Sequence, residues 1–280
     1  MRLKKPNDAG IAVKIGSYAF LAFAVIISLF PFYLMFISST LTTGEILSIP
    51  PKLTLGSNLA GNLANLKERI NIGRVMFNSL FVSVLYTLIT LILNSMAGYA
   101  LAKFSFKGKN LMFAVIMGTM MIPGQVLYIP QFSMMTVFGW ANRYEAVIVP
   151  ALANAFGIFL MRQNMMSFPD SLIEAARIDG YGEFSIFFKI VLPNLKPALG
   201  ALGIYNFMSQ WGSFMWPLII LSTEDLYTFP VALASLEGLM YKDYGMMMLG
   251  ATLSTIPILI MFLVFQKQFV SGLLGGAVKE

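Results

Sequence analysis

A charged stretch in the second half of the chain contains the residues best placed to bind a partner. Residues 167–198 carry acidic and basic side chains, whereas the flanking apolar segments, 146–161 and 199–221, carry none. Such a stretch is expected to lie in water between two segments that lie in lipid. Within it, Glu174 has no basic residue at i+4, where Ile178 stands, so its carboxylate is free to form an ion pair outside its own helix.

Two short helices are expected to position this carboxylate. Proline at 169 is tolerated in a first helical turn, and Asp170 complements the helix dipole there. Gly180 can adopt the left-handed conformation that ends a helix. Apolar residues recur at helical spacing on both sides of this glycine until Pro193 stops the second helix: Leu172, Ala175 and Ala176 before it, and Phe184, Phe187, Phe188 and Val191 after it.

The spacing of these residues resembles a known motif. Glu174-Ala175-Ala176, three residues, Gly180, nine residues and then Ile190-Val191-Leu192-Pro193 is similar to the EAA loop of permease subunits in bacterial ATP-binding-cassette (ABC) importers. The resemblance implies that this helical hairpin docks in a cleft on a cytoplasmic ATPase and couples it to transport. The residues implied are Glu174, Ala175, Ala176, Asp179, Gly180, Ile190, Leu192 and Pro193. The alternative is an ordinary amphipathic hairpin resting on the bilayer surface.

Composition places the chain in a membrane. Of its 280 residues, 58% are hydrophobic and 11% are charged, and the mean hydropathy is +0.76. Neither cysteine nor histidine occurs, which excludes thiol catalysis, disulfides and imidazole chemistry, and we expect no cofactor and no metal site in this subunit. The basic residues lie beside apolar segments, the pattern of membrane orientation, so nucleic acid is not an expected partner.

Six apolar segments are near the length that a membrane-spanning helix needs. They predict an all-α, six-span fold with residues 1–14 before it, a membrane domain at 15–265 and a tail at 266–280. The first segment is too long for a signal peptide, so we expect it to be retained. The expected spans are 15–38, 75–100, 111–134, 146–161, 199–221 and 245–265.

The distribution of lysine and arginine predicts the orientation. Thirteen of these residues fall on the side that holds both termini and the hairpin, against six on the other side. By the positive-inside rule, both termini are expected in the cytoplasm of a bacterial cell with this chain in its inner membrane. The two long external connections are 41–74 and 222–244. In relatives of the maltose permease the connection equivalent to 222–244 reaches toward an external sugar-binding protein. Alternatively, residues 222–244 are only a solvated connector with a turn or two of helix.

Polar residues within the fifth span indicate a transport path. Asn206, Ser209, Gln210 and Ser213 follow i, i+3, i+4, i+7 spacing, and polar side chains in hydrocarbon are expected to face a bundle interior or a water-filled path. Hydrogen bonding between helices explains the pattern equally well. Relatives often carry Trp-Asn followed by an acidic residue here, and this chain has Trp211-Gly212-Ser213 instead.

Prolines and the tail extend the resemblance to the sugar-permease branch. Pro123 and Pro130 predict kinks near the third span. The ending resembles the G-type subunit of the maltose permease, whose tail reaches between two ATPase subunits. The implied ATPase contacts are Gly276, Ala277, Val278 and Lys279.

The resemblance thus implies a permease subunit of an ATP-driven sugar or oligosaccharide importer. No G-x-x-x-x-G-K-[ST] sequence occurs, so ATP hydrolysis is expected in a partner, and this chain is not expected to be an enzyme. The implied partners are a second homologous permease subunit, two ATPase subunits and an external binding protein, besides membrane lipid. Glycerol-phosphate and polyol importers share these motifs. A secondary transporter would be expected to carry ionisable residues in its spans, and the six apolar segments contain none. A membrane enzyme would be expected to carry a cluster of carboxylate, histidine or cysteine side chains at one membrane depth, which this sequence does not predict.

Overall fold

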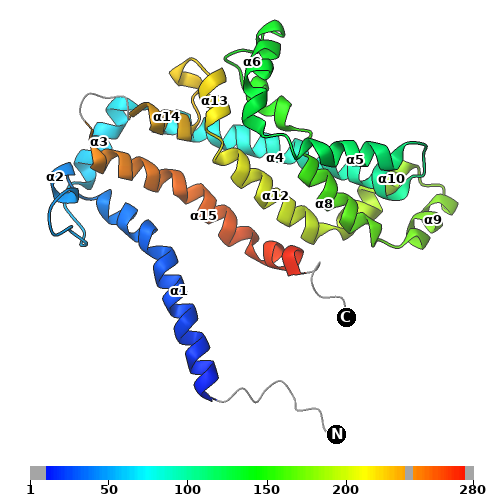
Figure 1. Ribbon diagram of the computed structural model, residues 1–280, viewed down its shortest axis with the longest axis horizontal. Helices are drawn as coiled ribbons and strands as arrows, with labels where there is room; N and C mark the ends of the chain where they lie inside the picture. Colours follow the sequence, from blue (N-terminus) through cyan, green and yellow to red (C-terminus); the bar gives the residue numbers. More distant parts are fainter. Residues whose placement is uncertain (1–10, 237–241, 275–280) are drawn as a thin grey trace. The chain divides into compact units, whose positions relative to one another are not determined.

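The computed structural model describes residues 11–236 and 242–274, and its regular elements are helices joined by loops (Figure 1). No strand occurs in these two ranges. The chain divides into two compact units, one formed by residues 1–70 and 236–255 and the other by residues 71–235 and 256–280. The expected all-α membrane fold is confirmed.

The first unit is organised by polar side chains at the ends of its helices. It contains α1 (Ile11–Ser38), α2 (Thr43–Ile46), α3 (Leu59–Arg69) and the start of α15 (Tyr244–Leu274). Asn62 is buried and donates hydrogen bonds to the carbonyls of Ser39 (2.8 Å) and Leu41 (2.9 Å). Asp243 accepts from the backbone N–H of Met246, an N-cap that satisfies one of the free donors at the start of α15.

The second unit is built on α4 (Ile72–Lys103). Its other elements, in chain order, are α5 (Lys109–Thr119), η1 (Gly124–Leu127), α6 (Tyr128–Val137), α7 (Tyr144–Ile148), η2 (Val149–Ala151), α8 (Ala155–Met166), α9 (Asp170–Ile178), α10 (Glu183–Ile186), η3 (Phe187–Val191), α11 (Leu192–Asn194), α12 (Lys196–Trp211), α13 (Met215–Ile220), η4 (Glu224–Leu226), α14 (Phe229–Ser235) and the second part of α15.

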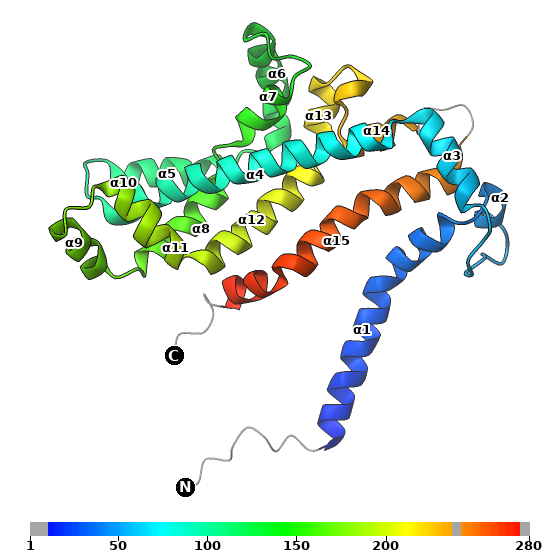
Figure 2. The same cartoon turned by 180° about the vertical axis from the view of Figure 1, so that it is seen from behind.

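Helices α8 and α12 both lie along α4 (Figure 2). Two glycines allow α4 and α8 to approach closely. A Cβ atom on Gly98 would stand 2.8 Å from the backbone nitrogen of Arg162, and one on Gly157 would stand 2.2 Å from the side chain of Asn94. Small residues at such positions let helix backbones pack in direct contact, which is how helices associate in membranes. Helices α4 and α8 are therefore in close contact along their backbones at these two positions.

Side chains satisfy both ends of α4. Asn71 is the N-cap and accepts from the N–H of Arg74 at 3.0 Å. At the other end, Lys109 donates to the carbonyls of Ala102 and Phe104, and Arg162 donates to that of Leu101 at 3.3 Å. Cations at a helix C-terminus pair with free carbonyls and with the negative end of the dipole.

Three of the six expected spans are single helices. Within the described residues, three helices are long and apolar enough to cross a membrane, namely Val13–Ser38, Ile72–Lys103 and Tyr244–Gln266. The other three expected spans are broken, and the number of candidate spans rises to six when each bent helix pair is counted as one span. The third such pair joins Glu183–Asn194 to Lys196–Trp211 at 84° and therefore differs from the predicted span 199–221. The first, second and sixth predicted spans are therefore confirmed as helices, with bounds that differ by a few residues.

The third predicted span, 111–134, is broken, and one of the two prolines predicted to kink it, Pro123, lies at the break. Helix α5 ends at Thr119, and the segment from Gly124 to Val137 leaves at an angle of 93°. Pro123 causes the break, because it has no N–H to donate and disfavours helical geometry at the residue before it. Pro130, by contrast, lies in the first turn of α6, where proline is tolerated.

The fourth and fifth predicted spans are also interrupted. The fourth bends by 44° between η2 and α8, where Asn154 caps a new helix by accepting from the N–H of Gly157. The fifth ends at Trp211 and resumes at Met215, because a continuous helix would bring the ring of Pro217 against the carbonyl of Ser213. The 16 residues of α12 extend about 24 Å, less than the ~30 Å hydrocarbon core.

Candidate functional site: the 167–198 hairpin

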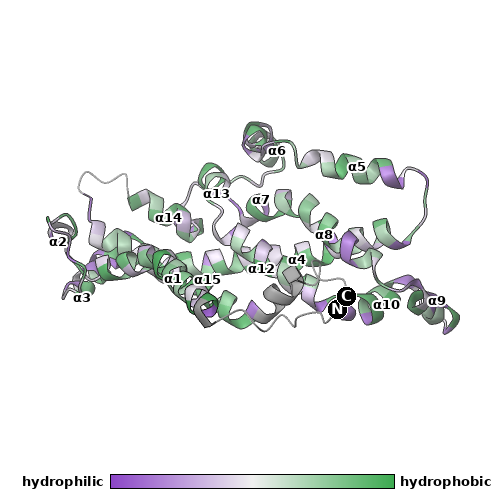
Figure 3. Ribbon diagram, turned by 60° about the horizontal axis from the view of Figure 1, so that its bottom comes forward, coloured by the Kyte–Doolittle hydropathy of each residue, from purple (hydrophilic) through white to green (hydrophobic). Residues whose placement is uncertain are grey.

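The first half of the hairpin is α9, which presents two different faces. Ile173 and Ala176 are buried, whereas Leu172 and Ala175 are exposed and Ile178 is 87% exposed. Coloured by hydropathy, α9 alternates hydrophilic and hydrophobic residues (Figure 3). The sequence pattern had grouped Leu172 and Ala175 with Ala176, and this grouping is wrong because only Ala176 packs on the core. Leu172, Ala175 and Ile178 therefore form an exposed apolar row on a helix rich in charges.

Gly180 ends this helix as predicted. Its φ is +83°, in the left-handed region, and the N–H groups of Gly180 and Tyr181 donate to the carbonyls of Arg177 and Ala176, both at 3.0 Å. This pair of hydrogen bonds is a Schellman motif, which needs a residue at positive φ. A Cβ atom on Gly180 would meet no other atom within 4 Å, so backbone conformation alone selects glycine here.

The second half of the hairpin is α10, η3 and α11, which follow one another directly. Phe187 and Val191 are buried, as the spacing indicated, while Phe184 is 71% exposed and Phe188 is also exposed. Pro193 does not stop the helix, contrary to expectation, since α11 continues to Asn194. The π-helical turn η3 accommodates the proline: the N–H of Leu192 donates to Phe187, five residues back, and Pro193 begins a new turn in which no N–H is needed.

An ion pair inside the hairpin leaves Glu174 available. Arg177 Nε donates to Glu183 Oε1 at 2.6 Å across the Gly180 turn. The hydrogen bond from Arg177 lowers the pKa of Glu183, and the same contact raises the pKa of Arg177. Within the described residues Glu174 is exposed and has no hydrogen bond or ion pair, as its spacing from Ile178 suggested.

The hairpin is also joined to the end of α4. Lys103 Nζ lies 2.5 Å from the carbonyl oxygen of Phe168 and 2.6 Å from Asp170 Oδ1, and Tyr99 Oη donates to Glu183 Oε2 at 3.2 Å. Sequence reasoning missed both α4 residues. No local signal reveals them, because Tyr99 lies 84 residues from its partner and Lys103 lies 67 residues from Asp170.

The four residues of the predicted transport path have different surroundings on and after α12. Asn206 is fully buried, Gln210 is 9% exposed, Ser213 is half-buried and Ser209 is exposed. Neither amide atom of Asn206 has a hydrogen-bond partner within the described residues. Asn206 and Gln210 therefore face the interior of this unit, whereas Ser209 points elsewhere, and the role of the four in a path stays a prediction.

The comparison with known proteins decides the family. The sequence profile of the family described as "Binding-protein-dependent transport system inner membrane component" matches residues 94–274, well over half of the chain. The chain belongs to this family. The resemblance to permeases of ABC importers is thereby confirmed, and the matched range contains the whole hairpin of this inner membrane component.

Similar proteins include three transport permeases. The lactose transport system permease protein LacG of Rhizobium radiobacter is 37% identical, over 94% of this chain and 95% of that protein. The arabinooligosaccharides transport system permease protein AraQ of Bacillus subtilis is 35% identical over 90% of each chain. The sn-glycerol-3-phosphate transport system permease protein UgpE of Pectobacterium atrosepticum is 32% identical, over 94% of this chain and 96% of that protein.

A solved structure shares the fold of this inner membrane component. It is a chain from a bacterial ABC transporter involved in the import of the acidic polysaccharide alginate, with a TM-score of 0.79, 23% identity, and coverage of 96% of this chain and 100% of that chain. The three relatives match 90% or more of this chain, so the similarity extends well beyond the segments that contain the motifs. Of the predicted sites, the tail residues Gly276 to Lys279 lie outside the described residues.

The N-terminal part of α4 in this inner membrane component contributes to a second polar cluster. Asn78 is buried and donates to the carbonyls of Asp225 (2.8 Å) and Tyr227 (2.9 Å), and Ser79 Oγ accepts from the N–H of Phe229 at 2.6 Å. The predicted short helix in the 222–244 connection is present as α14. Contacts from α4 therefore fix the start of this connection, which is more than a solvated connector.

Proposed function

We propose that this chain is one of two permease subunits of an ATP-driven oligosaccharide importer and receives its driving force through the 167–198 hairpin. The observation that carries the proposal is the exposed row of α9, which consists of Leu172, Glu174, Ala175 and Ile178. Membership of a binding-protein-dependent family supports a soluble binding protein outside and an ATPase inside. Closure of two ATPase subunits would move the hairpin, and rocking of the helix bundles would switch access to the path.

The proposal is tested with the whole complex. The subunit is co-expressed with its second permease subunit, ATPase and binding protein, purified through a tag on this chain and reconstituted in vesicles. ATP supplied on the ATPase side is expected to drive solute uptake in the presence of the binding protein. Uptake driven by an ion gradient without ATP would contradict the proposal and favour a secondary transporter.

Neutral sugars are the proposed substrate class. LacG and AraQ are named for lactose and arabino-oligosaccharides, whereas UgpE is named for a phosphate ester and is less similar. The side chains proposed to line the path are amides and hydroxyls, which suit hydroxyl groups, while phosphate groups favour arginine and lysine. Competition between a neutral oligosaccharide and glycerol phosphate in the vesicle assay separates the two classes.

The predicted orientation can be tested because the chain contains no cysteine. Ser105 and Ser235 are both exposed and lie on opposite sides of the proposed membrane domain. We expect Ser235→Cys to react with an impermeant maleimide in sealed cells and Ser105→Cys to react only in inverted vesicles. Reaction of both cysteines from outside would contradict cytoplasmic termini and a cytoplasmic hairpin.

For the path, Gln210→Leu is expected to lower uptake at least about tenfold while the complex still assembles, because the amide would no longer offer hydrogen bonds to a sugar. Met208→Leu is the matched control, since Met208 is 44% exposed on the same helix. Uptake and assembly are measured on the same vesicles. Unchanged uptake in Gln210→Leu, or loss of the complex, would contradict a role in the path.

A further inference from the structure

We propose that Tyr99, Lys103 and Glu183 act as positioning residues that clasp the hairpin to α4, so that the two move as one body during transport. The inference rests on the proposed function, because it concerns how movement of the hairpin reaches the helix bundle. It adds a second surface to the hairpin, distinct from the exposed row of α9. The two surfaces have different tasks: one meets the ATPase, and the other holds the membrane helix.

Lys103 fixes the start of α9. Only 5% of its side chain is exposed, although it carries an ammonium group, whereas the side chain of its partner Asp170 is 74% exposed. A buried ammonium group needs close partners, and this one has the carbonyl of Phe168 as well as the Asp170 carboxylate. The lysine therefore holds the residues that immediately precede α9 and the first residue of that helix.

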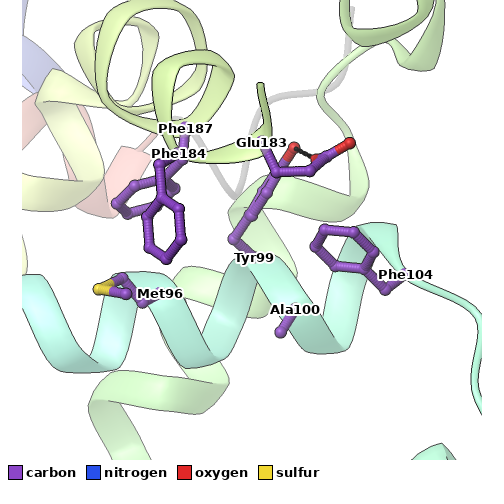
Figure 4. A pocket seen from close by; sticks show the side chains of 7 residues that line it. All are labelled: Met96, Tyr99, Ala100, Phe104, Glu183, Phe184 and Phe187. Atoms are coloured by element: carbon purple, nitrogen blue, oxygen red, sulfur yellow. Dashed lines mark hydrogen bonds between the residues drawn. The ribbon is translucent and has the colours of Figure 1, made fainter. Parts of the chain in front are cut away.

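Glu183 fixes the start of α10 through a carboxylate shared by two donors. One oxygen accepts from Tyr99 of α4 and the other from Arg177 of α9. Figure 4 shows the Tyr99 hydroxyl directed at this carboxylate, beside a pocket of about 240 Å³ that Phe184 and Phe187 also line. One side chain thus joins both halves of the hairpin and α4.

Aromatic packing supports the same contact. The Tyr99 ring lies 5.4 Å from that of Phe187 and 5.5 Å from that of Phe104, measured between centroids. Phe187 is 2% exposed and belongs to one core cluster together with Ile173 and Ala176 of α9. Because densely packed interiors transmit displacement rather than absorb it, a push on the hairpin should reach α4 directly.

The residues of the clasp and the exposed row of α9 lie on different faces of the hairpin. Ile173 and Ala176 of α9 face the core, while Glu174 and Ile178 are exposed. Weakening the clasp should therefore leave the ATPase attached. It should let the hairpin move without α4, so that ATP is hydrolysed with less transport.

Tyr99→Phe and Lys103→Gln are the decisive variants, tested as reconstituted complexes with the ATPase and binding protein. Tyr99→Phe keeps the buried ring and removes only the hydroxyl. We expect solute transported per ATP hydrolysed to fall at least about fivefold in each, the effect of losing one such hydrogen bond, with normal ATPase co-purification. Lys107→Gln, at an exposed lysine four residues after Lys103, is the matched control and should show the normal ratio.

Two further variants separate positioning from general stability. Lys103→Arg should keep more than half of the wild-type amount of solute transported per ATP hydrolysed, because arginine can donate to both oxygen partners. The double variant Tyr99→Phe/Glu183→Ala should be no worse than the poorer of its two single variants, since Glu183→Ala already removes the acceptor of the Tyr99 hydroxyl.

Three outcomes would contradict the proposed clasp. They are a normal amount of solute transported per ATP in Tyr99→Phe and Lys103→Gln, loss of the ATPase from these variants, or failure of Tyr99→Phe to assemble. A wild-type complex without ATP-driven uptake would instead refute the proposed function.

Discussion

Replacement of Gly180 by valine is expected to abolish ATP-driven uptake while the subunit still enters the membrane. The backbone at this position has a φ of +83°, and a β-branched residue is strongly disfavoured there. The strain, about 1 to 2 kcal/mol or more, would disrupt the two hydrogen bonds that end α9 and would change the angle between the two halves of the hairpin. Uptake and the amount of subunit in the membrane are measured together.

Two variants near the same turn provide the controls. Gly182→Ala should retain uptake, because Gly182 has a φ of −73° and a Cβ atom there would meet nothing within 4 Å. Gly180→Asn should retain more activity than Gly180→Val, since asparagine tolerates the left-handed conformation. Full uptake in Gly180→Val would show that the shape of this turn is not needed for coupling.

Glu174→Ala is expected to release the ATPase from the complex. Its carboxylate is exposed and unpaired within the described residues, and the resemblance implies an arginine on the ATPase as its partner. Loss of one partner from a desolvated ion pair at an interface costs about 2 to 5 kcal/mol. That corresponds to a fall in affinity of about 30-fold or more, measured as the ATPase retained during purification.

The matched control is Glu68→Ala, an exposed carboxylate in α3 on the other side of the proposed membrane domain, which should keep the ATPase bound. Glu174→Asp should bind more weakly than the wild type and more tightly than Glu174→Ala, because the charge remains on a shorter side chain. Normal retention of the ATPase in Glu174→Ala would contradict the proposal that the exposed row of α9 binds the ATPase.

The broken spans show how far local patterns reach. Hydropathy located all six apolar segments, because exclusion from water depends on composition. The prolines of the segment 111–134 predicted kinks there, and Pro123 does break the helix, whereas the break before Pro217 in the segment 199–221 was not predicted. A proline can kink a helix, end it or begin it. The outcome depends on which backbone carbonyl loses its hydrogen-bond donor and on which group of a neighbouring helix replaces that donor.

For the hairpin, local patterns were enough to predict the features that depend on nearby residues: the turn at Gly180, the start of α9 at Asp170 and the exposed carboxylate of Glu174. Spacing along one helix and the backbone preference of glycine suffice for these. The buried face of α9 and the contacts of Tyr99 and Lys103 of α4 with the hairpin became known only from the folded chain. The reason is physical: burial and long-range hydrogen bonds depend on which surfaces meet, and residues 84 positions apart carry no local trace of that contact.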